Sequence, residues 1–272
     1  MMTANPKEYL GTKFFDKLIG GHREWLMGFD KVYLETWQNL FTKNNSEAAL
    51  CEAATRKLLF DHGCNVKPFE DPSSGGVDFK CSKNGNTFYA EATCITKNVA
   101  SDKTGLTHLT IPNEATDYAY LTRTICQELS NKTSQCSGLD APCIVVIGTC
   151  HFQAGCLCFD DLAAEELLTG KTHITKRIDR DSGKAVGESY ELTQLESAAF
   201  IRPNAKSPHF IEHARCPISA VLLCAFGTDP MHTAGILHPD PTNIFNRALL
   251  PDITFCRLVD GYARGPLEVE WI

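Results

Sequence analysis

Apolar residues recur at two periods along the first 150 positions, and the changes of period predict an order of elements. Residues 46–60 are rich in helix formers, with Ser46 as the expected N-cap. Short runs at 64–69 and 142–148, bounded by turn residues, predict strands, the first of them at an edge of the sheet. Residues 117–134 carry apolar side chains at spacings of three and four, which predicts a further helix.

A β-hairpin is predicted between the first of these strands and the second helix. Asn84-Gly85 lies between two alternating runs, and both central residues of a type I′ turn need positive φ. Counting outward from this turn pairs Asp78 with Glu91. Alternation then places Asp78, Glu91 and Thr93 on a polar face, near which the helix at 46–60 is expected to pack. The opposite, apolar face is expected to hold Val77, Phe79, Phe88, Ala90, Ala92 and Cys94.

Both ends of the chain add elements to this order. Residues 7–41 carry aromatic side chains at helical spacing, which predicts a helical lead-in interrupted at Gly20-Gly21. Beyond residue 150, the pattern predicts a short helix at 160–168 and a mobile polar loop at 169–190. Two more strands are expected, at 218–226 and 233–238.

These elements predict an α/β fold built on a mixed sheet. The expected core at 46–150 runs helix, three strands, helix, strand. A helical lead-in at 1–45 precedes it, and a C-terminal extension at 151–272 packs on the same domain.

Composition narrows the class of protein. With 272 residues, 43% of them hydrophobic, the chain can bury a sizeable core. Its formal charge of -7 means that the surface as a whole repels a phosphate backbone, so a nucleic-acid contact needs a local basic patch. Thirteen cysteines without a CxxC pair predict free thiols in a reducing cytoplasm. No apolar run approaches the roughly 20 residues of a membrane span.

The predicted pairing of Asp78 with Glu91 indicates a cation site. Like charges directly opposite each other in a hairpin are destabilising unless something compensates them. A divalent cation such as Mg²⁺ binds carboxylate oxygens and would do so. Two of the acids also have a simpler interpretation. Glu52 could pair with Arg56 at i,i+4, and Asp78 could accept hydrogen bonds from loop N–H groups. Glu91 is harder to explain in this way, because it lies inside an aromatic and β-branched strand.

At these residues the sequence resembles the PD-(D/E)xK nuclease superfamily, which has the restriction-endonuclease-like fold. The matching positions are Glu52 or Glu47 on the helix, Asp78 in Gly76-Val-Asp-Phe79, and Glu91 in Tyr89-Ala-Glu-Ala-Thr93, and the match covers about residues 46–150. The resemblance implies hydrolysis of phosphodiester bonds with Mg²⁺ or Mn²⁺. It implies that Asp78, Glu91 and the main-chain carbonyl of Ala92 hold the metal, with Glu52 assisting.

The sequence departs from the family at the lysine, where it has Thr93. That lysine would orient the attacking water or neutralise charge on the phosphate, and a threonine hydroxyl supplies no charge. Lys80, Lys97 and Lys132 are the candidate replacements. We favour Lys132, because a helix packed on the sheet holds an ammonium group in a fixed place.

Two histidine patterns suggest other metals. His209-Phe-Ile-Glu-His213 matches the HxxEH zinc string, but only 59 residues follow His213 and a third ligand is needed well downstream. His232, His238 and Asp240 lie near one another in the sequence, yet His-Pro and Asp-Pro steps are more often turn chemistry. We expect a zinc site at neither place.

Three functions follow as expectations. The first is a Mg²⁺-dependent nuclease-like enzyme that acts on DNA or RNA. The second is a nuclease-fold protein that no longer cleaves and serves as a binding or assembly module, which Thr93 and the acidic net charge favour. The third is an interaction protein without a nucleic-acid role. No membrane partner is expected, and a homo-oligomer stays open.

Overall fold

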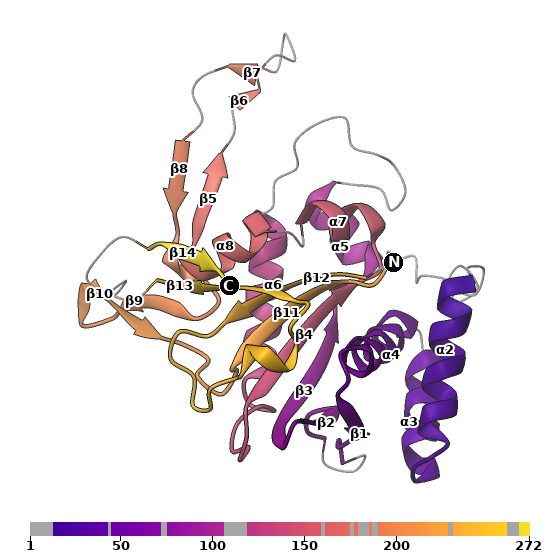
Figure 1. Ribbon diagram of the computed structural model, residues 1–272. Helices are drawn as coiled ribbons and strands as arrows, with labels where there is room; N and C mark the ends of the chain where they lie inside the picture. The colour runs from indigo at the N-terminus through magenta and orange to yellow at the C-terminus, as the bar shows by residue number, and fades with distance from the viewer. Residues whose placement is uncertain are drawn as a thin grey trace.

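A single eight-stranded sheet organises the molecule (Figure 1). The computed structural model describes residues 13–42, 45–71, 75–105, 119–158, 161–174, 177–178, 185–186, 190–227, 231–259 and 267–272. The strand order is β1-β2-β3-β4-β11-β12-β13-β14, with parallel pairing of β3 with β4, β4 with β11 and β12 with β13. The strands are β1 Asn65–Pro68, β2 Phe79–Lys83, β3 Asn86–Cys94, β4 Cys143–Thr149, β11 Ala220–Ala225, β12 His232–Leu237, β13 Thr254–Leu258 and β14 Val269–Trp271. The prediction of a mixed α/β sheet is confirmed.

Helices cover both faces of this sheet (Figure 1). The first group packs its apolar side chains with Phe79, Phe88 and Ala90 in one cluster, and the second group packs with Tyr89, Val145 and other residues in a separate cluster. The first group is α2 Lys13–Leu26, α3 Lys31–Thr42 and α4 Ser46–Asp61; the second is α5 Lys97–Thr104, α6 Ala119–Lys132, α7 Phe152–Cys158 and α8 Asp161–Thr169. Among the described residues, no helix combines the length and apolar character that a membrane crossing requires.

The predicted hairpin register is confirmed. Asn84 and Gly85 have φ values of 52° and 77°, as a type I′ turn needs. Five pairs follow the count outward from this turn, from Lys83 with Asn86 to Phe79 with Ala90. The turn therefore sets which β3 side chains face α4 and which face α6.

The faces of the hairpin differ from the prediction in two respects. Helix α4 packs on the apolar face of β2 and β3, whereas α6 covers the face that carries Glu91 and Thr93. Val77 lies before β2 and joins the cluster on the α6 side, because the chain has left the pleat there. Helices therefore cover both faces of the sheet, and Glu91 on the polar face is buried, although Lys80 on the same face is exposed.

Several predicted boundaries are wrong. Helix α2 runs through Gly20-Gly21, and the chain breaks at Met27 to Asp30 instead. Asn45, rather than Ser46, is the N-cap of α4, and its side chain makes no capping hydrogen bond. Helix α5 was not expected between β3 and α6, and residues 117–118 lie outside the described part of the chain.

The C-terminal half extends the sheet and adds ribbons to it. Strands β11 and β12 match the two predicted strands, while α7, β13 and β14 were missed. The polar loop expected at 169–190 contains a ribbon that projects from the main sheet (Figure 1), although several of its residues lie outside the described ranges. The smaller pieces are β5 Lys171–Ile174, β6 Arg177–Ile178, β7 Ala185–Val186, β8 Tyr190–Thr193, β9 Ile201–Asn204, β10 Ser207–His213, and the 3₁₀ turns η1 Leu195–Ser197 and η2 Arg247–Leu249.

Close packing of α4 on the sheet centre predicts a cost for adding a single methyl group. A Cβ at Gly148 in β4 would lie 2.5 Å from Cys51 Sγ and 2.9 Å from the Phe226 ring. We expect Gly148→Ala to lower the free energy of unfolding by about 1–3 kcal/mol, because the core is overpacked. Gly20→Ala is the matched control: nothing lies within 4 Å of its Cβ position in α2, and we expect it to stabilise by about 0.5–1 kcal/mol. Urea unfolding curves test both, and equal stabilities would contradict this packing.

Candidate functional site

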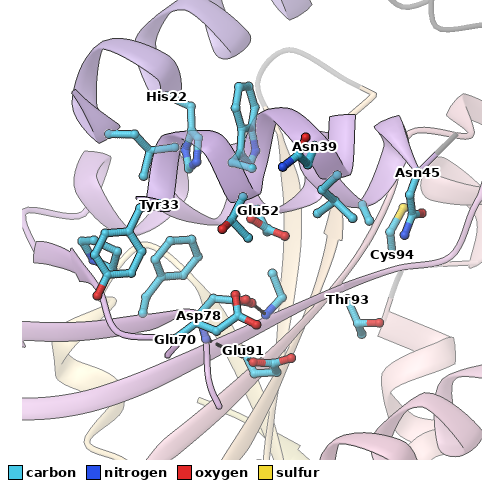
Figure 2. Close-up of a pocket in the computed structure, with 18 of the residues that line it drawn as sticks. His22, Tyr33, Asn39, Asn45, Glu52, Glu70, Asp78, Glu91, Thr93 and Cys94 are labelled. Atoms are coloured by element: carbon cyan, nitrogen blue, oxygen red, sulfur yellow. Dashed lines mark hydrogen bonds between the residues drawn. The ribbon is translucent and has the colours of Figure 1, made fainter. Parts of the chain in front are cut away.

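A cavity of about 620 Å³ lies between α3 and α4 on one side and the ends of β2 and β3 on the other. Figure 2 shows four carboxylates gathered near its centre: Glu52 from α4 on one wall, and Glu70, Asp78 and Glu91 opposite it. Three of these are residues that the sequence analysis proposed. The structure therefore brings the predicted acids to one place, together with Ala92, Thr93 and Lys132, which also line the cavity.

The acidic pair of the hairpin lies where the backbone ladder ends. Asp78 is one residue beyond the last paired position of β2, so its own N–H and that of Ala92 are not used in the ladder. The Asp78 N–H donates to Glu91 Oε2 at 3.2 Å, and the Ala92 N–H donates to Asp78 Oδ2 at 2.6 Å. Side-chain hydrogen bonds thus replace the ladder and hold both carboxylates at the edge of the cavity. Asp78 does accept a backbone N–H, but the donor is Ala92 in strand β3 and not the loop that the sequence suggested.

Helix α6 supplies the positive charge of the site. Lys132 Nζ lies 2.6 Å from Glu91 Oε1, and the side chain of Glu91 is almost fully buried. One turn earlier, Thr93 Oγ1 donates to Glu128 Oε2 at 3.3 Å. The two contacts fit because residues i and i+4 of a helix rise by about 6 Å, close to the roughly 6.6 Å between residues i and i+2 of a strand. Lys132, the replacement favoured from the sequence, is therefore the lysine that reaches the acidic pair.

Glu52 and Glu70 complete the acidic group. Glu52 projects from α4 into the cavity (Figure 2) and makes no hydrogen bond to any described residue. Its alternative partner Arg56 lies over the Trp25 ring instead, 5.4 Å from the centroid, so the i,i+4 pair is not formed. Glu70 follows β1 and was not predicted. The hydrogen bond from the Phe69 N–H to the Asp78 carbonyl places it beside the hairpin, but no short turn in the sequence sets that pairing.

Crowding of these carboxylates changes their protonation. Burial raises the pKa of Glu52 to about 8, and the charges of Glu70 and Glu91 contribute to the rise. Burial and then the charge of Glu91 hold the pKa of Asp78 well above its usual range. Burial also raises the pKa values of Glu70 and Glu91, although Lys132 opposes this. Burial lowers the pKa of Lys132, but its contact with Glu91 outweighs that effect, and the pKa is raised overall.

Three predicted candidates lie away from the cavity. Glu47, the alternative to Glu52, accepts hydrogen bonds from the Lys97 N–H at 2.7 Å and from Cys150 Sγ at 3.2 Å. Lys97 is the first residue of α5 and does not line the cavity. Lys80 extends over the rings of Phe69 and Tyr89, with Nζ 5.8 Å and 5.5 Å from their centroids. Of the three candidate lysines, only Lys132 contacts the acids.

The two histidine patterns lie on strand β10 and at the two ends of strand β12. The HxxEH string lies on strand β10, where residues i and i+4 are about 13 Å apart instead of one helical turn. In that string Glu212 pairs with Arg202 at 2.5 Å, and His213 lies 3.0 Å from Asp240. His238 accepts from the Asp240 N–H at 2.9 Å, which is the turn chemistry that the His-Pro and Asp-Pro steps indicated.

The donor set of the cavity suits a hard cation, although the side chains are not closed around one. Within the described part of the chain, no three acidic, histidine or cysteine side chains converge into a ready-made metal site. Both oxygens of Glu91 accept hydrogen bonds, whereas Asp78 Oδ1 and the Glu52 carboxylate accept none from described residues. Carboxylate oxygens are the ligands that Mg²⁺ and Mn²⁺ prefer. These free oxygens would have to close by side-chain rotation to bind such an ion.

The raised pKa of Glu52 predicts a dependence of stability on pH. Between pH 4.5 and about 8 the folded protein holds a proton on Glu52 that the unfolded chain releases, so stability falls as the pH rises through this window. In EDTA, we expect the free energy of unfolding to fall by about 1–3 kcal/mol from pH 5 to pH 8. Glu52→Gln should flatten this slope, while Glu24→Gln on the exposed side of α2 should keep it. Parallel slopes for both variants in urea titrations would contradict the assignment.

Comparisons of the chain with protein-family models, with curated proteins and with solved structures found no match. The chain is therefore assigned to no family here. The resemblance to PD-(D/E)xK nucleases depends on the residues of the hairpin and of α4, and the chemistry of the site follows from its own geometry.

Proposed function

We propose that this protein is a Mg²⁺-dependent, nuclease-like hydrolase that cleaves phosphodiester bonds in nucleic acid, with the restriction-endonuclease-like arrangement at its core. Asp78, Glu91 and the carbonyl of Ala92 would hold the metal, and Glu52 would assist from α4. The observation that carries the proposal is the contact between Lys132 Nζ and Glu91 Oε1 at 2.6 Å. Through this contact, helix α6 supplies an ammonium group to the cluster of acids, since strand β3 has Thr93 at the lysine position.

The residues divide the chemistry as follows. Asp78 Oδ1 and the Glu52 carboxylate accept no hydrogen bond from described residues, which suits a cation. A bound Mg²⁺ would act as a Lewis acid toward a phosphoryl oxygen and lower the pKa of its water. Lys132, held by Glu91, would orient the attacking water or neutralise charge that develops on the phosphate. Thr93 would keep Glu128, and with it this turn of α6, against β3.

A second function, the inactive binding or assembly module, is favoured by one feature of the same site. Glu91 already accepts two hydrogen bonds, one on each oxygen, from Lys132 and from the Asp78 N–H, which leaves fewer lone pairs for a metal. A cluster satisfied in this way can be purely structural. Cleavage assays separate the two functions.

The roles of the residues predict a set of cleavage rates. With Mg²⁺ or Mn²⁺, we expect Asp78→Ala to abolish cleavage of a labelled DNA or RNA strand, since it removes a metal ligand. Lys132→Met should lower the rate by about 10²–10³-fold, the usual effect of losing one charge-stabilising group. Adding Thr93→Lys to Lys132→Met should restore part of the loss, because position 93 lies on the Glu91 face of β3.

Three results would contradict this assignment. Lys80→Met is the matched control, because Lys80 is exposed and lies outside the cavity, and it should keep the wild-type rate. Full activity of Lys132→Met would remove the proposed role of Lys132. Cleavage by Asp78→Ala would remove the proposed metal site at Asp78. No cleavage by the wild-type protein with either metal would favour the binding module.

A further inference from the structure

The cavity extends past the carboxylates in both directions (Figure 2). At one end lie the rings of Tyr33 and His22, and at the other the amide side chains of Asn39 and Asn45. The acids occupy the middle. The cavity is therefore a groove with three chemically distinct parts, and only the middle part is explained by metal chemistry.

Helix α3 builds one wall of this groove. Tyr33, Thr36, Trp37 and Leu40 line the cavity, and their spacings of three, one and three put them on one face of the helix. Trp37 is buried, and its Nε1–H donates to the Ala49 carbonyl of α4 at 3.0 Å. This hydrogen bond ties α3 to α4, the helix that carries Glu52.

The polar groups along the groove have no hydrogen-bond partner among the described residues. The side chains of Thr36, Asn39 and Asn45 are exposed and available to a ligand, and Asn45 leaves its N-cap role unused. At the other end, His22 is 1% exposed and its Nδ1 is buried without a hydrogen-bond partner. Figure 2 shows its ring directed toward the cavity, between Tyr33 and Glu52. A buried polar atom without a partner is costly unless a ligand satisfies it.

The volume of the cavity limits which form of nucleic acid can reach the acids. A cavity of about 620 Å³ has the size of a site for a small molecule, enough for a few nucleotides of one strand. A duplex keeps its bases paired inside two backbones, and α3 and β3 stand on either side of the acids. Single strands, in contrast, offer unstacked bases to aromatic rings and base edges to amide groups.

We propose that the substrate of this site is a single strand of nucleic acid that lies along the groove. One base stacks at Tyr33 beside His22, the next phosphate lies over Asp78 and Glu52, and the following nucleotide is contacted by Asn39 and Asn45. The inference rests on the proposed function, because the acids must hold a cation before they can accept a phosphate. Asn39, Asn45 and Tyr33 are binding residues in this arrangement.

Fluorescence anisotropy of the full-length protein tests the proposal. The probes are a short labelled DNA oligonucleotide and the same oligonucleotide annealed to its complement, with Ca²⁺ in place of Mg²⁺ because it accepts the same oxygen ligands. We expect the single strand to bind at least about tenfold more tightly than the duplex. Tyr33→Ala should weaken single-strand binding by about 5- to 150-fold, the range for losing one stacked base. The double variant Asn39→Ala/Asn45→Ala should weaken it by about two- to tenfold, the range for losing one hydrogen bond.

A matched control separates local from general effects. Gln38 precedes Asn39 on α3 but does not line the cavity, so Gln38→Ala should bind the single strand as the wild type does. Calorimetric titration with Mn²⁺ should give the same affinity in all of these variants, which shows that the acids and the fold are intact.

The possible failures are distinguishable. Equal or tighter binding of the duplex, or unchanged binding by the Asn39→Ala/Asn45→Ala and Tyr33→Ala variants, overturns the single-strand inference while Mn²⁺ binding leaves the proposed function standing. Absence of Mn²⁺ binding by the wild type overturns both.

Discussion

Four carboxylates share a half-buried cavity with a single ammonium group, and this imbalance of charge governs the site. Glu52, Glu70, Asp78 and Glu91 lie close enough to raise one another's pKa values, and Lys132 neutralises only one of them. Without a cation, the protein must hold protons on some of these groups or tolerate their repulsion. The arrangement is therefore either a site that binds a cation or a structural feature that lowers the stability of the fold. The free oxygens of Asp78 and Glu52 favour the cation site.

The backbone explains why the imbalance persists. Strand β2 begins at Phe79, whereas β3 continues past Ala90, the residue paired with Phe79. The N–H groups of Asp78 and Ala92 therefore donate to carboxylate oxygens and not to the ladder. Helix α6 runs beside β3 and matches its spacing, which delivers Lys132 to Glu91 and Glu128 to Thr93. A lysine from a helix thus stands beside the acids where the strand itself offers a threonine.

Local signals in the sequence were enough for the hairpin and for much of the core. Asn84-Gly85 fixes its own turn, and the register of β2 and β3 follows from it without any distant contact. Features that depend on partners far along the chain were missed or misplaced. Glu70 reaches the site through a β1–β2 pairing that no short turn specifies. Helix α4 packs on the apolar face of the hairpin, whereas the sequence pattern predicted it near the polar face. Gly20-Gly21 did not break α2, because α2 packs Leu18 and Leu26 into the same cluster as α4, and tertiary packing outweighs the low helix propensity of glycine. The sequence could name Lys132 as a candidate but could not show that it reaches Glu91, since packing sets the alignment of α6 with β3.

A titration with Mn²⁺ at pH 7, repeated in buffers with different ionisation enthalpies, tests the central claim most directly. If the carboxylate cluster is a cation site, the metal displaces the proton that Glu52 holds at this pH, since its pKa is raised to about 8. The account predicts saturable binding, release of a proton on the order of one per metal bound, and a smaller release in Glu52→Gln. Absence of binding, or binding without proton release, would contradict it.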